Sequence, residues 1–182
     1  MRKMYLSAPL PFVGQKRMFA KEFMKVLEQY PDGTLFVDLF GGSGLLSHIT
    51  KSLKPHSTVI YNDFDNYRFR MKHIPQTNQL LADIREMVGN SVPRHKIIKG
   101  ELRERIFSRI EQEENSTGYV DFITLSSSIL FSMKYKLSVQ DMRKEALYNN
   151  IRKTGYPECT DYLEGLEIVS CDYKEVFNRY KD

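Results

Sequence analysis

The segment VDLFGGSGLLSH, residues 37–48, constrains the fold more than any other part of the chain. The apolar run at 34–39 is typical of a buried strand, three glycines follow it, and Leu45–Leu53 continues with a helical pattern until Pro55. Glycines at such a turn let the backbone bend sharply and leave room for a ligand against the main chain. The segment therefore predicts a strand–turn–helix unit with a binding site at the turn.

Two further apolar runs extend this unit into a sheet. Residues 58–61 read as a second buried strand, which ends in the acidic turn NDFDN, and residues 165–171 read as a third strand, followed by Asp172 and a short helix. An amphipathic helix over about 15–30 precedes them and is stopped by Pro31-Asp32-Gly33. Strands that alternate with helices predict an α/β fold with a parallel sheet.

The middle of the chain differs in composition: it is rich in Arg, Lys, Tyr and Met and poor in strand-like runs. The pattern predicts helices at 67–88 (interrupted by Pro75), 93–114 and 139–152, whereas 119–136 fits either a strand or a buried helix. We therefore predict three parts: residues 1–66 and 154–182, which form the sheet, and a helical insertion at 67–153.

Length and composition limit the class of protein to which the chain can belong. With 182 residues the chain has room for one domain with an insertion, and its formal net charge of +4 permits a polyanionic partner without requiring one. The two cysteines, Cys159 and Cys171, fit neither a metal-ligand spacing nor a disulfide framework. No apolar run approaches the roughly 18 residues that a membrane span needs. We therefore expect a cytoplasmic protein with no membrane segment and no metal.

The charge beside the glycine turn bears on the ligand. A dinucleotide site would show G-x-G-x-x-G, but the glycines here read G-G-x-G and Asp38 lies three residues before the first of them. A carboxylate there repels a phosphate and attracts a cationic amine, which favours S-adenosylmethionine. The alternative is a turn whose glycines serve packing alone.

Two more acids follow the other predicted strands. Asp63 lies about 20 residues beyond the glycines, where an open parallel sheet offers a carboxylate to a ribose hydroxyl. Asp172 follows the third strand, where it could accept a hydrogen bond from an adenine amino group. Each acid alone is more often a helix cap or turn residue, but three at successive strand ends favour a ligand site.

The order of four sequence blocks carries a resemblance. The blocks are PFVGQK (11–16), FVDLFGGSG (36–44), YNDFDN (61–66) and LEGLEIVSCDYKEV (163–176). Together they resemble the Dam-like, D12 class of DNA adenine-N6 methyltransferases, enzymes associated with restriction–modification. The resemblance implies a Rossmann-like S-adenosylmethionine-dependent fold with a helical target-recognition insertion. It assigns cofactor binding to Phe12, Gly14, Lys16, Asp38, Phe40, Gly42, Gly44, Asp63 and Asp172.

One family signature is missing. The D-P-P-Y motif, which holds the target amine and stacks on the flipped base, requires adjacent prolines, and no two prolines of this chain are adjacent. We therefore assign no catalytic residue to this chain, expect it to be inactive alone, and expect a truncated, split or degenerate gene product. The exposed side of strand 34–39 would then pair in a homodimer or with a second polypeptide that completes the sheet.

The insertion is the expected contact with double-stranded DNA. Basic side chains lie among aromatics there and could follow a phosphate backbone. For any one of them a solvated helix face is the more common explanation, but the segment as a whole favours DNA contact. The candidate DNA-binding residues are Arg68, Arg70, Lys96, Lys99 and Arg103. The predicted function is site-specific DNA adenine-N6 methylation. The alternatives are a non-catalytic remnant that binds cofactor or DNA, and a fragment of another nucleotide-binding protein.

Overall fold

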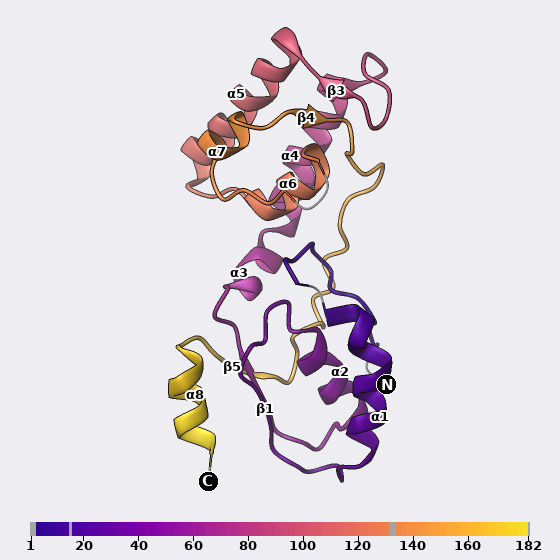
Figure 1. Ribbon diagram of the computed structural model, residues 1–182, viewed down its shortest axis with the longest axis vertical. Coiled ribbons are helices and arrows are strands. Elements are labelled where there is room, and N and C mark those ends of the chain that lie inside the picture. The colour runs from indigo at the N-terminus through magenta and orange to yellow at the C-terminus, as the bar shows by residue number, and fades with distance from the viewer. Residues whose placement is uncertain (1–2, 15, 132–133, 182) are drawn as a thin grey trace. The chain divides into compact units, whose positions relative to one another are not determined.

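The chain divides into two compact units. The computed structural model describes residues 3–14, 16–131 and 134–181. Unit 1 combines Met1–Met71 with Glu158–Asp182, and unit 2 is Lys72–Pro157 (Figure 1). Both boundaries fall a few residues beyond those that the sequence placed at 66 and 153.

Unit 1 contains a three-stranded parallel sheet in the order β1-β2-β5, formed by Phe36–Asp38, Val59–Asn62 and Glu167–Val169. In its register Val37 lies opposite Ile60 and Ile60 lies opposite Glu167. The predicted parallel α/β arrangement is thus confirmed. Because parallel strands point the same way, the loops that follow β1, β2 and β5 lie at one edge of the sheet.

Helices cover both faces of this sheet. Figure 1 shows α1 (Ala20–Glu28) and α2 (Leu45–Leu53) on one side of the strands and α8 (Tyr173–Tyr180) on the other. The 3-10 helix η1 (Lys16–Phe19) leads into α1. Ala20, Leu27, Leu45 and Ile49 form a buried cluster between α1 and α2, against which Phe36 packs. Burial of a large aliphatic side chain stabilises a fold by roughly 1.5–3 kcal/mol, so this cluster fixes both helices on the sheet.

Unit 2 is mainly helical. Its helices are α4 (Ile74–Val88), α5 (Gly100–Thr117), α6 (Phe122–Ile129) and α7 (Val139–Arg143), and the short α3 (Tyr67–Lys72) precedes them. Two-residue strands, β3 (Ile97–Ile98) and β4 (Leu147–Tyr148), pair antiparallel. The ambiguous run at 119–136 contains α6. Among the described residues, no helix is both long and apolar enough to cross a bilayer.

The predicted helices at 93–114 and 139–152 are wrong in extent. The first begins only at Gly100, whose φ of 61° is left-handed, and the second stops at Arg143. The residues left over form the β3–β4 pair, in which Ile98 and Leu147 are fully buried. Burial of these two apolar side chains against the rest of the unit favours a strand pair over longer helices.

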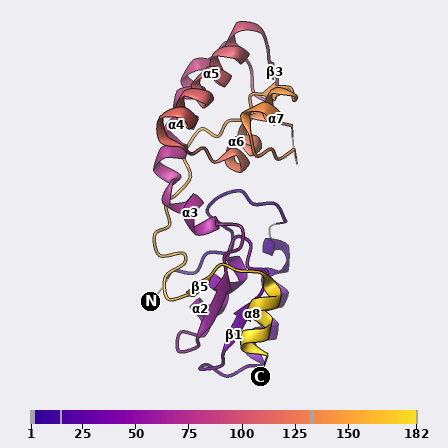
Figure 2. The ribbon, with the colours of Figure 1, turned by 90° about the vertical axis from the view of Figure 1, so that its left-hand side faces the viewer.

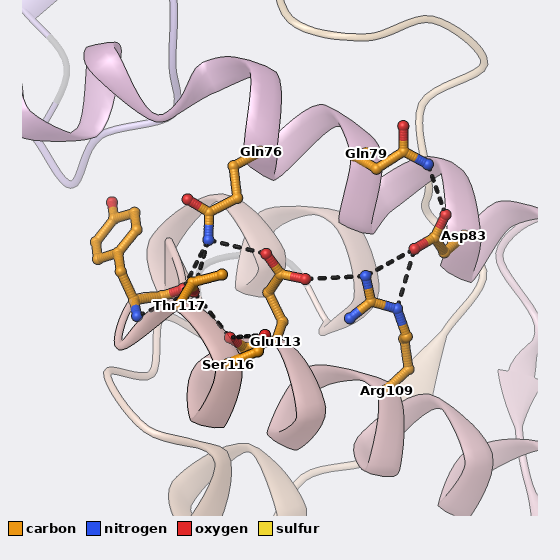
Figure 3. A network of polar contacts seen from close by, with 8 residues as sticks. Gln76, Gln79, Asp83, Arg109, Glu113, Ser116 and Thr117 are labelled. Carbon is orange, nitrogen blue, oxygen red and sulfur yellow. Dashed lines mark hydrogen bonds and ion pairs between the residues drawn. The ribbon is translucent and has the colours of Figure 1, made fainter.

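A polar network joins α4 to α5. The guanidinium of Arg109 lies 2.8 Å from an oxygen of Asp83 and 2.9 Å from an oxygen of Glu113. Gln76 donates from Nε2 to Glu113 and to the hydroxyl of Thr117, each at 2.8 Å (Figure 3). Figure 2 shows the two helices of this contact from the side. Several basic and acidic groups of the insertion are therefore bound to one another.

Candidate functional site

A cavity of about 400 Å³ opens in unit 1 at the carboxyl edge of the sheet. This volume lies within the range of small-molecule sites, which runs from about 300 to 1,000 Å³. Its walls come from the N-terminal segment, the loops after β1 and β2, and the start of α8. The lining residues are Phe12, Val13, Gly14, Lys16, Leu39, Phe40, Gly41, Gly42, Ser43, Asn62, Phe64, Asp65, Asp172 and Tyr173.

The glycine turn fits between the cavity and β2. A Cβ atom on Gly41 would lie 2.3 Å from the ring of Tyr61, and one on Gly42 would lie 3.0 Å from the ring of Phe12. Gly42 also has a φ of 53°, a left-handed conformation that side chains disfavour. The glycines therefore serve close packing against two aromatic rings. Gly41 and Gly42 also line the cavity.

Tyr61 of β2 connects the glycine turn to the acidic turn. Its hydroxyl lies 2.7 Å from the carbonyl oxygen of Gly42 and 3.0 Å from Oδ1 of Asp63. Burial raises the pKa of the Tyr61 phenol, and the charge of Asp63 raises it further. The phenol therefore keeps its proton and remains a donor between the two turns.

Asn62, which the sequence analysis missed, joins the loops after β1 and β5. Its side-chain amide donates to the carbonyl oxygens of Leu39 at 3.1 Å and Cys171 at 2.9 Å, and its Oδ1 accepts from the amide of Cys171 at 3.2 Å. Asn62 is 1% exposed. The signal in the sequence was a polar residue that closes an otherwise apolar strand.

Lys16 and Asp38 lie together beside the turn. The Lys16 ammonium donates to the carbonyl oxygen of Phe40 and lies 3.8 Å from Oδ1 of Asp38. Oδ2 of Asp38 accepts from the hydroxyl of Ser47 at 2.7 Å. Lys16 lines the cavity, whereas Asp38 does not, so Asp38 is next to the site through its contact with Lys16. Gln15 of the same sequence block lies outside the described residues.

The N-terminal wall is held by α3. The hydroxyl of Tyr67 accepts from the amide of Leu10 at 2.9 Å, and Arg70 donates from Nη2 to the carbonyl oxygen of Pro11 at 2.8 Å. The ring of Phe12 lies edge-on to the ring of Tyr67, with centroids 5.8 Å apart. The segment that carries Phe12 and Gly14 is therefore held in place by α3.

The predicted cofactor residues separate into two groups. Those that line the cavity are Phe12, Gly14, Lys16, Phe40, Gly42 and Asp172. Those that lie outside the lining are Asp38, Gly44 and Asp63. Gly44 is the left-handed residue that precedes α2, and Asp172 also caps α8 by accepting from the amide of Lys174 at 2.8 Å.

The predicted DNA-binding residues also differ in their surroundings. Arg70 is 6% exposed and holds Pro11, and Arg103 donates to the carbonyl oxygen of Arg143 at 2.6 Å. These two guanidinium groups serve the fold. Arg68, Lys96 and Lys99 are exposed.

Within residues 3–14, 16–131 and 134–181, no three His, Cys, Asp or Glu side chains are grouped so that they could hold a metal ion.

The lining of the cavity offers aromatic faces, one ammonium group and two carboxylates. Such a set can bind a small zwitterionic or cationic ligand that carries a ring.

Comparison with known proteins found a relative that is described as a methyltransferase. No family model matches the chain. A protein of Haemophilus influenzae described as "Putative methyltransferase" is 40% identical over 185 aligned positions, which cover all of this chain. The chain spans 62% of the length of that relative. The similarity therefore includes the whole cavity and the whole of unit 2.

Proposed function

We propose that unit 1 binds S-adenosylmethionine in a Rossmann-like methyltransferase fold, and that the chain belongs to a site-specific DNA adenine-N6 methyltransferase. The observation that carries the proposal is the cavity at the carboxyl edge of the parallel sheet, under a glycine turn and beside Lys16. The relative described as a methyltransferase supports the same activity class.

The cavity fits the parts of this cofactor. Phe40, Phe64 and Tyr173 line it and are 62%, 65% and 42% exposed, which leaves apolar ring faces for an adenine. Lys16 can pair with the methionine carboxylate, and Asp172 can accept from the adenine amine. The bound cofactor supplies a methyl group on a positively charged sulfur. The chain's own residues bind and orient it and exclude water.

A pyrophosphate fits the same cavity less well. Asp65 and Asp172 contribute two carboxylates to the lining and Lys16 contributes the single ammonium. Like charges close together in a partly enclosed site repel, so a dinucleotide would be disfavoured. This charge distribution separates the proposal from the dinucleotide alternative.

Double-stranded DNA is the proposed substrate. Lys96 and Lys99 flank β3, are exposed, and have no acidic partner among the described residues. Each free cation that neutralises a phosphate releases a condensed counterion and makes binding depend on salt. Arg68 remains a candidate DNA contact on unit 1. Arg70 and Arg103 are not part of the proposed DNA contact, because their guanidinium groups bind backbone carbonyls of the fold.

Calorimetry on this chain tests the cofactor. S-adenosylmethionine and S-adenosylhomocysteine should bind with measurable heat and NAD should not. Binding of NAD alone would establish a dinucleotide protein instead.

The DNA step is tested on the longer Haemophilus relative. Incubation with radiolabelled S-adenosylmethionine and duplex DNA, followed by nucleoside analysis, should yield N6-methyladenine. Cofactor binding without methylated DNA would leave the cofactor proposal standing and remove the DNA proposal.

A further inference from the structure

Two carboxylates lie in the turn after β2, and their surroundings differ. Asp63 is 3% exposed. Its Oδ1 accepts from the amide of Tyr67 at 2.6 Å and its Oδ2 accepts from the amide of Arg68 at 2.9 Å. The hydroxyl of Tyr61 lies 3.0 Å from the same Oδ1. The carboxylate of Asp63 is therefore occupied by the start of α3 and by β2.

Asp65 has the opposite environment. It is exposed and lines the cavity beside Phe64. Within the part of the chain that the structure describes, no donor binds its carboxylate. The turn that separates the two acids closes through the amide of Asn66, which donates to the carbonyl oxygen of Asp63 at 3.2 Å, and Asn66 has a left-handed φ of 60°. Asp65 thus lines the cavity with a carboxylate that is not engaged by another group of the described chain.

We infer that Asp65, and not Asp63, accepts the ribose hydroxyls of the cofactor, and that Asp63 is a positioning residue. The inference rests on the proposed function. A ribose presents two neighbouring O–H donors, and a carboxylate with both oxygens free can accept both. Asp63 already accepts from two backbone amides, the Tyr61 hydroxyl lies 3.0 Å from its Oδ1, and it does not line the cavity.

The experiment is titration calorimetry with S-adenosylhomocysteine and its 2′-deoxy analogue on the unaltered chain, Asp65→Asn, Asp63→Asn and Glu164→Gln. Glu164 is an exposed acid outside the lining, so its variant controls for the loss of one negative charge. Asp65→Asn should bind S-adenosylhomocysteine about tenfold more weakly, because a charge-assisted hydrogen bond is lost. Glu164→Gln should bind it normally.

The deoxy analogue identifies the contact. It should bind the unaltered chain about tenfold more weakly than S-adenosylhomocysteine, and this difference should shrink to less than threefold in Asp65→Asn. Asp63→Asn should lower the urea midpoint, because two amides of α3 lose a charged acceptor, while it keeps the discrimination.

Three results would overturn the inference. If Asp65→Asn bound S-adenosylhomocysteine with the affinity of the unaltered chain and discriminated equally against the deoxy analogue, the inference would be overturned while the proposed function would stand. Loss of the discrimination in Asp63→Asn but not in Asp65→Asn would return the contact to Asp63. Absence of binding to the unaltered chain would overturn the proposed function as well.

Discussion

The hydroxyl of Tyr61 lies 2.7 Å from the carbonyl oxygen of Gly42, so a side chain of β2 holds the glycine turn that follows β1. The ring of the same tyrosine occupies the space where a side chain on Gly41 would lie. Its hydroxyl also reaches Asp63, which holds the start of α3. One buried residue therefore fixes both turns that bound the cavity.

Replacement of Tyr61 by Phe should loosen both turns. The change removes the hydroxyl and leaves the Gly42 carbonyl without that donor, which costs about 1–3 kcal/mol of unfolding free energy. Urea denaturation measures the loss, and S-adenosylhomocysteine should bind more weakly. Tyr30→Phe is the control, because Tyr30 is 46% exposed and does not line the cavity. A Tyr61→Phe variant as stable as the unaltered chain would contradict this prediction.

Gly41→Ala should be more damaging than Gly100→Ala. The new Cβ would lie 2.3 Å from the Tyr61 ring and 2.7 Å from the Asn62 carbonyl oxygen, so β2 or the turn must move. Overpacking of this kind typically costs 1–3 kcal/mol. Gly100→Ala is the comparison, because a Cβ there meets nothing within 4 Å and only the left-handed backbone is strained. Equal unfolding free energies for the two variants would show that the turn yields easily.

Stability should fall in alkaline solution. Burial raises the pKa of Tyr61 and of Tyr162 above the ordinary value, so the folded chain keeps both phenol protons. The unfolded chain loses them at about pH 10. The stabilisation is therefore complete below about pH 10 and declines as the pH rises further. Urea denaturation between pH 8 and pH 11 should show the decline.

Urea denaturation of Tyr61→Phe and Tyr162→Phe over the same pH range shows which tyrosine causes the alkaline loss of stability. Each variant lacks one of the two phenols and should lose less stability over this pH interval than the unaltered chain does. Tyr30→Phe should decline as steeply as the unaltered chain. Parallel curves for all four proteins would mean that other groups govern the alkaline limit.

Local sequence determined most of unit 1. The helix at Leu45–Leu53 has the predicted bounds, because Gly44 precedes it and Pro55 follows it. The strands were predictable from short apolar runs between turn residues. The β3–β4 pair was not, because two-residue strands carry no periodic signal and exist only through pairing between Ile97–Ile98 and Leu147–Tyr148.

The position of the cavity could be predicted from the sequence, but the environments of the individual side chains around it could not. Sequence order brought the loops after β1, β2 and β5 to one edge, and six of the residues assigned by resemblance line the cavity there. The sequence could not show that Asp63 is buried and hydrogen-bonded while Asp65 lines the cavity, because both acids follow the same strand. This difference depends on the left-handed backbone at Asn66 and on the two amides of α3 that donate hydrogen bonds to Asp63.

The 182-residue chain should transfer no methyl group to DNA. It contains no D-P-P-Y sequence, so by the family resemblance nothing holds the target amine in line with the methyl group. Purified chain, radiolabelled S-adenosylmethionine and duplex DNA should give no N6-methyladenine above background, whereas the Haemophilus relative should give it. Methylated adenine formed by the chain alone would show that another part of it positions the base.

The open side of β1 should be covered in solution. Within the described sheet β1 has one neighbour, β2, and the adjoining Leu35 and Phe40 are 48% and 62% exposed. An unpaired strand edge with apolar side chains invites pairing with another chain. We therefore expect a homodimer or an assembly with a second polypeptide, and light scattering at micromolar concentration should give a mass above the 21.4 kDa of one chain.

Amide hydrogen exchange tests this edge residue by residue. The Phe36 amide donates to the carbonyl oxygen of Thr58 and so faces β2. Amides alternate in direction along a strand, which places the Val37 amide on the open side. Val37 should be protected as well as Phe36 is, and its protection should fall on dilution while that of Phe36 persists. A monomer whose Val37 amide exchanges freely at every concentration would show that water covers this edge and that β1 needs no partner.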